Sequence, residues 1–392
     1  MSHRGVRIAV VGCGYWGPNH IRNFMSLRSE GAEMAAAVDY DPLRRKRVSE
    51  MYPTIAVLAD VNDVLEDPGI DAVVIATPVG THYSLAKRAL VAGKHVLVEK
   101  PLTTDPVQAD ELTRTANAMD RVLMVGHTFE YAAAVNRVRE IIEEGRLGDI
   151  LYVRSLRVNL GLFQTDVNVV WDLAPHDVSI LLYTLQMTPT AVMAVGNANI
   201  NPNIEDVASI TIEFGSNVMA NIMVSWLDPR KVREMTIVGS KKMLVYDDIS
   251  ANEKIRIFDK GVDGPAEYES FGEFHYSYRY GDIITPFVHE HEPLREECAH
   301  FLECIKTGRT PRSGGREGLE VARVLSAAQT SLRNQGERVA LAETMLEPSL
   351  FSHSESETGG PRGTTGERGL MNDLERPNSR SVAVPSTVGQ AV

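Results

Sequence analysis

Residues 6–17 read Val-Arg-Ile-Ala-Val-Val-Gly-Cys-Gly-Tyr-Trp-Gly, an apolar, β-prone run that leads directly into a Gly-x-Gly-x-x-Gly turn. A helical pattern over residues 18–27 follows at once, so the predicted order is strand, tight turn, helix. This order is typical of a dinucleotide-binding turn. Gly12 allows the sharp bend, Gly14 lets the backbone approach a pyrophosphate, and Gly17 lets the helix pack closely against the strand. The alternative is a glycine turn that binds no ligand.

An acidic residue follows the next apolar stretch. Residues 34–38 predict a second strand, and Asp39 stands directly after it, 22 residues past Gly17. A carboxylate at this place accepts hydrogen bonds from the hydroxyls of an adenosine ribose and repels a 2′-phosphate. The sequence therefore predicts NAD as the cofactor. The basic run at 44–47 could form a phosphate clamp, but we interpret it as a solvated helix face.

Composition bounds the class of protein. The chain has 392 residues, of which 43% are hydrophobic and 23% charged, enough for two soluble domains. A net charge of −12 without a basic stripe argues against nucleic acid and anionic membranes as partners. No run approaches the ~18 apolar residues of a membrane span, and residues 1–5 lack a signal-peptide pattern. Cys13, Cys298 and Cys304 lack metal-site spacing. We expect a cytoplasmic protein with a small-molecule substrate.

Residues 1–127 alternate between short apolar strands and helices of 10–15 residues, a pattern typical of a doubly wound parallel sheet. The later strands of this region are predicted at 71–76, 95–99 and 122–125, and the later helices at 81–92 and 106–119. Ligands bind such sheets at the carboxyl ends of the strands. We therefore predict that residues 1–127 form an NAD-binding Rossmann domain of the α/β class.

Residues 128–348 have a different hydrophobic pattern. Alternating, strand-like segments occur at 150–158, 207–214, 218–226 and 232–238. Helical patterns occur at 175–185, 294–306 and 315–334. They predict an α+β substrate domain, with a mostly antiparallel sheet, helices on one face, and an open face that suits a homodimer or homotetramer. Residues 349–392 are rich in Ser, Gly and Pro and predict a disordered tail.

A lysine stands at the predicted ligand-binding edge, in the sequence Glu99-Lys100-Pro101. Such a lysine can bond a substrate hydroxyl, and a nearby nicotinamide cation should lower its pKa, which suits acid–base chemistry. The alternative is an exposed lysine that happens to precede a proline.

Asp172 and His176 are four residues apart around Pro175, which we predict to begin a helix. Their side chains should therefore lie close together. A histidine that takes the hydroxyl proton is what hydride removal from an alcohol requires. The alternatives are an N-cap aspartate with a core histidine, or a metal site. The metal site lacks a further ligand at suitable spacing, and His289-Glu290-His291 is a poor substitute.

These motifs together resemble the Gfo/Idh/MocA family, named for glucose–fructose oxidoreductase and inositol dehydrogenase. The resemblance covers residues 5–340, and its most specific element is Glu99-Lys100-Pro101. It implies that Lys100 and His176 act at the substrate hydroxyl and that Asp172 positions the substrate or the histidine. The implied cofactor contacts are Gly12, Gly14, Tyr15, Trp16, Gly17, Asp39, Thr77, Pro78, His82, Glu99 and Lys100.

A narrower pattern, at 12–19 and 171–177, resembles the family members that oxidise nucleotide-activated sugars, including UDP-N-acetylglucosamine 3-dehydrogenases. It implies that the segment from His127 to Tyr131 lies beside the sugar. Many relatives carry three glycines where this chain has Val167-Asn168-Val169-Val170, and Asn168 is our candidate for a sugar contact there. The implied substrate-binding residues are Lys100, His127, Tyr131, Asn168, Asp172 and His176.

Four functions are compatible with these residues. The leading hypothesis is NAD-dependent oxidation, or the reverse reduction, at C3 of a nucleotide sugar such as UDP-N-acetylglucosamine. The second is the same chemistry on a free polyol or sugar of the inositol type. The third is NAD-assisted glycoside cleavage, in which the cofactor is regenerated in each cycle. The fourth is a non-catalytic NAD-bound regulator, which the presence of Lys100, Asp172 and His176 disfavours.

Overall fold

The computed structural model describes residues 5–341, apart from 162, 166 and 264–276. The tail predicted at 349–392 lies outside the described residues. Among the described residues, no helix is long and apolar enough to cross a membrane. In the same part of the chain, no group of three or more His, Cys, Asp and Glu side chains could hold a metal ion.

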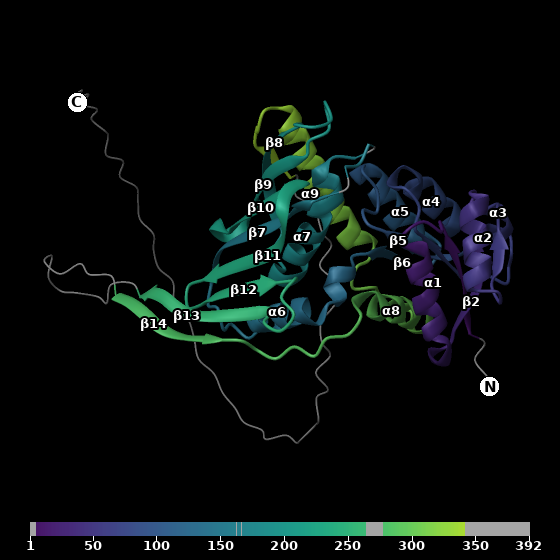
Figure 1. Ribbon diagram of the computed structural model, residues 1–392, viewed down its shortest axis with the longest axis horizontal. Coiled ribbons are helices and arrows are strands. Elements are labelled where there is room, and N and C mark those ends of the chain that lie inside the picture. The colour runs from purple at the N-terminus through teal and green to yellow at the C-terminus, as the bar shows by residue number, and fades with distance from the viewer. Residues whose placement is uncertain (1–4, 162, 166, 264–276, 342–392) are drawn as a thin grey trace, which may run out of the picture. The chain divides into compact units, whose positions relative to one another are not determined.

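Six parallel strands form the first sheet, in the order β3-β2-β1-β4-β5-β6. The sheet lies in the purple and blue part of Figure 1, where β2, β5 and β6 are labelled. The strands are β1 (Val6–Val11), β2 (Ala32–Val38), β3 (Ala56–Leu58), β4 (Ala72–Ile75), β5 (His95–Glu99) and β6 (Leu123–Gly126). The helices between them are α1 (Gly17–Ser26), α2 (Pro42–Met51), α3 (Asn62–Leu65), α4 (His82–Val91) and α5 (Pro106–Ala118). The chain starts at the centre of the sheet and winds outward on both sides, so the predicted Rossmann fold is confirmed.

Apolar residues cover both faces of this sheet. On one face Leu90 of α4 and Leu112 of α5 pack in the core, and on the other Ile21 and Phe24 of α1 do so. With both faces occupied by helices, the carboxyl ends of the strands remain as the edge that can hold a ligand.

Helix α8 (Pro293–Thr307) also belongs to this core, although the sequence placed it with the second sheet. Leu294, Cys298 and Phe301 recur at helical spacing, and all three are buried together with α1 residues. The sequence pattern showed an amphipathic helix but could not show which apolar layer its face would join. The late segment therefore returns to the first sheet and brings Cys298 next to His20 of α1.

Nine strands form the second sheet, in the order β14-β13-β12-β11-β7-β10-β9-β8-β15. They are β7 (Ile150–Leu160), β8 (Pro189–Asn197), β9 (Val207–Phe214), β10 (Met219–Ser225), β11 (Leu227–Gly239), β12 (Met243–Asp247), β13 (Ile255–Asp263), β14 (Ser277–Ile284) and β15 (Val339–Ala340). Within this second sheet, β7 and β10 are the only described strands that pair in parallel. The predicted mostly antiparallel sheet is confirmed.

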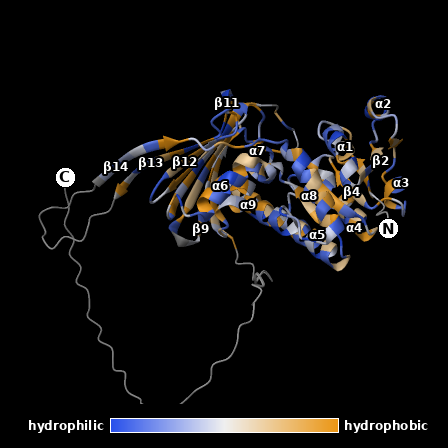
Figure 2. Cartoon of the chain, turned by 90° about the horizontal axis from the view of Figure 1, so that it is seen from below, coloured by the Kyte–Doolittle hydropathy of each residue, from blue (hydrophilic) through white to orange (hydrophobic). Residues whose placement is uncertain are grey.

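Three helices cover one side of the second sheet: α6 (Ala133–Glu143), α7 (Val169–Leu185) and α9 (Gly315–Arg333) (Figure 2). Helix α7 begins earlier than predicted, because its N-cap is Asn168 and Pro175 lies inside it. Pro175 lacks the N–H that would bond the carbonyl of Trp171, but burial of twelve residues of α7 outweighs that loss. As a result, Asp172 lies in the first turn of α7, where a carboxylate is favoured.

Candidate active site

The glycine turn after β1 is shaped for close approach of a ligand to the backbone. Gly12 has a φ of +94°, and a Cβ there would stand 2.5 Å from the carbonyl oxygen of Ala76. A Cβ on Gly17 would collide with the carbonyl oxygen of Gly12, whereas one on Gly14 would only touch the guanidinium of Arg44, at 3.7 Å. A side chain at Gly12 or Gly17 would collide with neighbouring backbone atoms and push the turn apart. The two glycines therefore allow the tight turn that fits the pyrophosphate of NAD.

Two aromatic side chains frame this turn. Tyr15 is 81% exposed, and its ring meets that of Trp16 edge to face, with centroids 5.3 Å apart. Exposed aromatic rings beside a nucleotide turn can cover a ligand with apolar surface. Their contact with the cofactor remains a prediction.

Asp39 ends β2 with its carboxylate already oriented. Its Oδ2 accepts a hydrogen bond from the main-chain N–H of Cys13 at 2.7 Å, and its Oδ1 accepts one from Asp41 at 2.8 Å. Arg44 lies 3.7 Å from the same carboxylate, and Arg45 donates to the main-chain oxygen of Asp39. The basic run is thus more than a solvated helix face, because two of its members turn back toward the expected ribose site.

The segment after β4 carries the predicted Thr77, Pro78 and His82. His82 is buried, and its Nε2 and Nδ1 lie 2.8 and 2.9 Å from the carbonyl oxygens of Thr77 and Pro101. Burial lowers the pKa of His82, while the two carbonyls oppose that effect. The imidazole therefore links the loop after β4 to the loop after β5. This link holds in place two loops that we expect to border the cofactor.

Lys100 follows β5, and its side chain contacts helix α7, which covers the second sheet. Its Nζ donates a hydrogen bond to the main-chain oxygen of Asp172 at 2.8 Å and lies 3.8 Å from the Oδ1 of that residue. Burial lowers the pKa of Lys100, and the carboxylates of Asp172 and Glu99 oppose it. A lowered pKa favours the neutral form of a lysine, which can accept a proton from a bound hydroxyl.

His176 lies one helical turn after Asp172 on α7. Its ring packs edge to face on Phe129 at a centroid distance of 5.0 Å. Its ring nitrogens bond no residue that the structure describes. Burial, and then the charge of Lys100, place the pKa of His176 well below its ordinary value. The imidazole is therefore neutral at physiological pH and free to bond a substrate hydroxyl.

A second residue also holds the carboxylate of Asp172. Its Oδ2 accepts a hydrogen bond from the indole Nε1 of Trp226 at 3.0 Å. The structure thus brings together Lys100, Asp172 and His176, which the sequence predicted as the catalytic set. Their roles remain predictions.

His127 follows β6 and also faces this cluster. It is 1% exposed, and neither ring nitrogen has a partner among the described residues. Burial and the charge of Lys100 lower the pKa of His127 to about 4. A buried imidazole without a partner is costly, so a ligand that bonds it would repay part of that cost.

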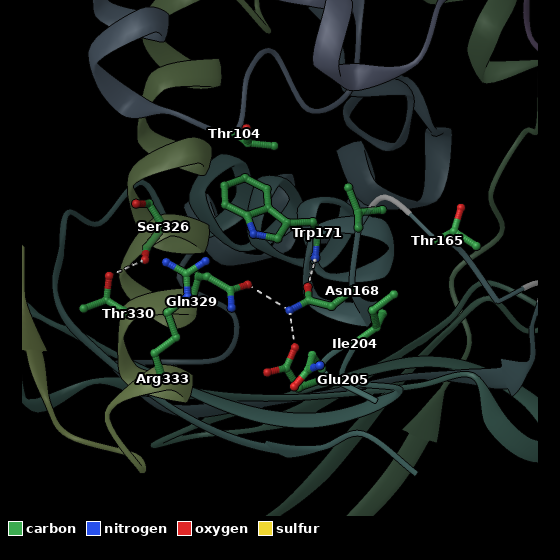
Figure 3. Close-up of a pocket in the computed structure, with 12 residues that line it drawn as sticks. Thr104, Thr165, Asn168, Trp171, Ile204, Glu205, Ser326, Gln329, Thr330 and Arg333 are labelled. Carbon is green, nitrogen blue, oxygen red and sulfur yellow. Dashed lines mark hydrogen bonds between the residues drawn. The ribbon is translucent and has the colours of Figure 1, made fainter. Parts of the chain in front are cut away.

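Two predicted substrate contacts lie elsewhere. The hydroxyl of Tyr131 is 3.1 Å from Ser313 Oγ, and its ring packs in the core of the first sheet. Asn168 caps α7: its Oδ1 accepts from the N–H of Trp171, and its amide donates to Glu205 and Gln329. Figure 3 shows Asn168 at one side of a pocket of about 400 Å³. Asn168 meets the cluster only through the main chain, since its carbonyl oxygen accepts from the N–H of Asp172 at 3.1 Å, and no bond joins the Tyr131 side chain to Lys100, Asp172 or His176 among the described residues.

Sequence reasoning missed the groups that support the cluster. Arg157 on β7 and Asp177 on α7 form a buried ion pair, with Nε and Oδ2 2.5 Å apart. The guanidinium of Arg157 stands 4.8 Å over the ring of Phe129, which packs on His176. Asp177 directly follows His176 and could have been noticed, but no local signal links it to Arg157.

Comparison with known proteins identifies the family. The Gfo/Idh/MocA model for the NAD-binding Rossmann fold matches residues 6–127, and the model for the C-terminal domain of the family matches residues 135–245. The chain therefore belongs to the Gfo/Idh/MocA oxidoreductases, as the sequence predicted. It is an NAD-dependent oxidoreductase, and the prediction of NAD as cofactor is confirmed.

Relatives of this chain include enzymes of two substrate classes. It is 27% identical over 347 residues to the NAD⁺-dependent scyllo-inositol 2-dehydrogenase of Bacillus subtilis, covering 85% of this chain and 96% of the relative. It is 28% identical over 266 residues to the UDP-N-acetylglucosamine 3-dehydrogenase of Acidithiobacillus ferrooxidans, covering 66% of this chain and 78% of the relative.

Solved structures share the fold. The Acidithiobacillus ferrooxidans enzyme superposes with a TM-score of 0.71 at 23% identity, covering 84% of this chain and 98% of that one. The WlbA dehydrogenase of Bordetella pertussis, crystallised with NADH and UDP-GlcNAcA, gives a TM-score of 0.71 at 21% identity, covering 88% and 100%. At these identities, the structural similarity shows a shared fold. The substrate has to be inferred from the residues of the site.

Proposed function

We propose that this protein oxidises a ring hydroxyl, at C3, of a nucleotide-activated sugar such as UDP-N-acetylglucosamine, or reduces the corresponding ketone. The observation that carries the proposal is the meeting of Lys100 with Asp172 and His176 at the carboxyl edge of the Rossmann sheet. Bound NAD supplies the hydride acceptor for this reaction.

The residues of the cluster accept the proton that the substrate hydroxyl loses. When the C–H bond of the alcohol loses its hydride, the O–H must lose its proton, or a protonated ketone results. Burial lowers the pKa of both Lys100 and His176, which favours the neutral, proton-accepting form of each side chain. Asp172, held by Trp226, fixes Lys100 through its main-chain oxygen. The hydroxyl would lie between Lys100 and His176.

Two lines of support favour a nucleotide sugar. The segments at 12–19 and 171–177 follow the pattern of the nucleotide-sugar members. A nucleotide-sugar dehydrogenase is also among both the relatives and the structural neighbours. A second candidate is oxidation of a free polyol, which the inositol dehydrogenases among the relatives favour.

NAD reduction followed by absorbance distinguishes these candidates. We expect NADH release with UDP-N-acetylglucosamine and little with scyllo- or myo-inositol. Release with inositols alone would replace the first candidate by the second. Turnover of a glycoside without net NADH would indicate the cleavage reaction instead.

Self-association is a second part of the proposal. The face of the second sheet away from its helices exposes Met219 and Met223 of β10 and Tyr152, the partner of Met219 on β7. Exposed apolar side chains on a broad sheet suit contact with another copy. We expect a homodimer or homotetramer by sedimentation velocity, and weaker association for Met223→Glu.

A further inference from the structure

Glu99 lies directly behind Lys100. The two residues are consecutive at the end of β5, so their side chains leave the strand on opposite faces. Lys100 turns toward α7, and Glu99 turns toward α1, where it is 8% exposed. There its Oε1 accepts a hydrogen bond from the Nε2 of His20 at 2.7 Å. His20 is the only hydrogen-bond partner of this carboxylate among the described residues.

His20 is itself held from behind. It is fully buried on α1, and its Nδ1 lies 3.7 Å from the Sγ of Cys298 on α8. Burial raises the pKa of the Cys298 thiol well above its ordinary value, so the sulfur keeps its proton. A thiol that donates to Nδ1 leaves the remaining ring proton on Nε2, where it bonds Glu99. The hydrogen bonds thus run from Cys298 to His20 and from His20 to Glu99, so that this series ends with a donor directed at the carboxylate of Glu99.

Two other buried acids nearby differ from Glu99. Glu297 on α8 accepts a bond from Thr128 at 3.1 Å but leaves its Oε1 without a partner, and Glu130 leaves its Oε2 so. Burial is the main cause that raises the pKa of both well above the ordinary value. Burial thus favours the neutral form of both acids, whereas Glu99 is the acid of this group that accepts a hydrogen bond from an imidazole.

Charged and titratable groups face the pair from each packed element. Lys100 and His127 face it from the loops after β5 and β6, and Cys298, Glu297 and Glu292 from α8. Arg22 of α1 is committed to Glu292, with two short contacts between guanidinium and carboxylate. No cation in this set forms an ion pair with Glu99. The negative charge of Glu99 therefore acts on Lys100 and on the residues beside Lys100.

We propose that His20 and Glu99 are a positioning pair that holds one negative charge behind Lys100 and sets the pH range in which Lys100 accepts the substrate proton. This inference rests on the proposed function of Lys100 as a base. Neither residue of the pair is placed in contact with substrate.

The direction of the effect follows from the charges. Burial and Arg157 lower the pKa of Lys100, whereas Asp172 and Glu99 raise it. Removing the charge of Glu99 lowers this pKa further, so Lys100 loses its proton at lower pH but becomes a weaker base. The acidic limb of the rate profile then moves to lower pH, while the plateau rate falls.

Four variants test the pair. Glu99→Gln removes the charge and keeps an oxygen that can accept from His20. His20→Leu removes the donor, whereas His20→Gln places an amide nitrogen near the position of Nε2 and should restore the bond. Glu297→Gln is the matched control, because burial already favours the neutral form of this acid and an amide is uncharged as well. Thermal unfolding checks that each variant is folded.

The first measurement is competitive acetylation of Lys100 across pH, quantified by mass spectrometry of its peptide, without substrate. We expect the midpoint to fall by about one pH unit in Glu99→Gln and His20→Leu. It should stay within about a third of a unit of the parent in His20→Gln and Glu297→Gln. The second measurement is the pH profile of kcat/KM, whose acidic limb should move in the same direction.

The outcomes separate the two proposals. An unchanged midpoint in folded Glu99→Gln, or an equal shift in Glu297→Gln, would overturn the positioning pair even if the enzyme oxidises sugars. If His20→Leu does not fold, the comparison of Glu99→Gln with Glu297→Gln still decides. Shifted midpoints in a protein that oxidises none of the tested sugars would overturn the proposed function and leave the pair intact.

Discussion

The cofactor turn and the catalytic cluster are built in contrasting ways. The contacts that shape the turn and Asp39 come from strand ends of one sheet and from α2 beside them, such as the bond from Cys13 to Asp39, 26 residues apart. The cluster joins residues 72 apart, at Lys100 and Asp172, and 54 apart, at Asp172 and Trp226. The turn is therefore specified by a short motif, whereas the cluster depends on how two sheets and α7 pack together.

Removing a base should have the largest effect in this comparison. Lys100→Met and His176→Ala should each lower kcat by about 10²–10⁴, the usual contribution of general-base catalysis. The Kd for NAD should change little, because the glycine turn and Asp39 are untouched. Initial rates and a fluorescence titration of NADH measure the two quantities.

The double variant sharpens this test. If Lys100 and His176 act as one unit, Lys100→Met with His176→Ala should cost much less than the product of the single losses. Near-normal turnover in either single variant, or a defect confined to NAD binding, would contradict the assignment.

A smaller effect is expected at the turn itself. Asp39→Ala should narrow the preference for NAD over NADP by about 10- to 100-fold, because the carboxylate that repels a 2′-phosphate is lost while Arg44 and Arg45 remain close by. The ratio of kcat/KM for the two cofactors measures this. A parent enzyme that used NADP as well as NAD would refute the role of Asp39.

Trp226→Phe tests how strongly the cluster depends on distant packing. The change removes the donor to Asp172 but keeps a ring that can pack on Phe163. A hydrogen bond to a charged group contributes about 1.5–3 kcal/mol, less when partly exposed, so we expect kcat to fall about tenfold. Trp171→Phe is the matched control, since its indole lies toward the pocket of Figure 3. Equal losses in both variants would show a general packing effect.

The smallest effect concerns stability against pH. Burial lowers the pKa of His127 to about 4, below its value near 6.5 in the unfolded chain. The unfolded state therefore binds the proton more readily, and stability is lost as pH falls from about 6.5 toward 4. His127→Gln should make the fall in Tm over this range less steep, as calorimetry can measure. An unchanged slope would show that His127 does not titrate there.

The sequence predicted the turn well because its signals are local. The glycines, Asp39 and the alternation of strands and helices each depend on neighbouring residues, and the structure has them as predicted. The packing of α8 on α1 and the start of α7 at Asn168 were not predicted. An apolar stripe does not name its partner, and Pro175 suggested a helix start that burial of α7 overrides.

The site shows the same division. Lys100 and His176 were identified from strand-end position and family resemblance, and the structure brings them to one cluster. Arg157, Trp226 and His20 were missed, because their importance comes only from contacts with residues far along the chain. Tyr131 was named from the resemblance, and Asn168 was our own candidate where the chain departs from the family pattern, but their side chains are committed to a core contact and a helix cap.

Transfer of deuterium from the sugar to the cofactor tests the central claim most directly. UDP-N-acetylglucosamine carrying deuterium at C3 would be incubated with NAD and the protein, and the reduced cofactor analysed by mass spectrometry. We predict that deuterium appears in the reduced cofactor with the parent protein and at a rate lower by about 10²–10⁴ with Lys100→Met. Reduced cofactor that carries no deuterium, or none formed from this sugar at all, would contradict the account.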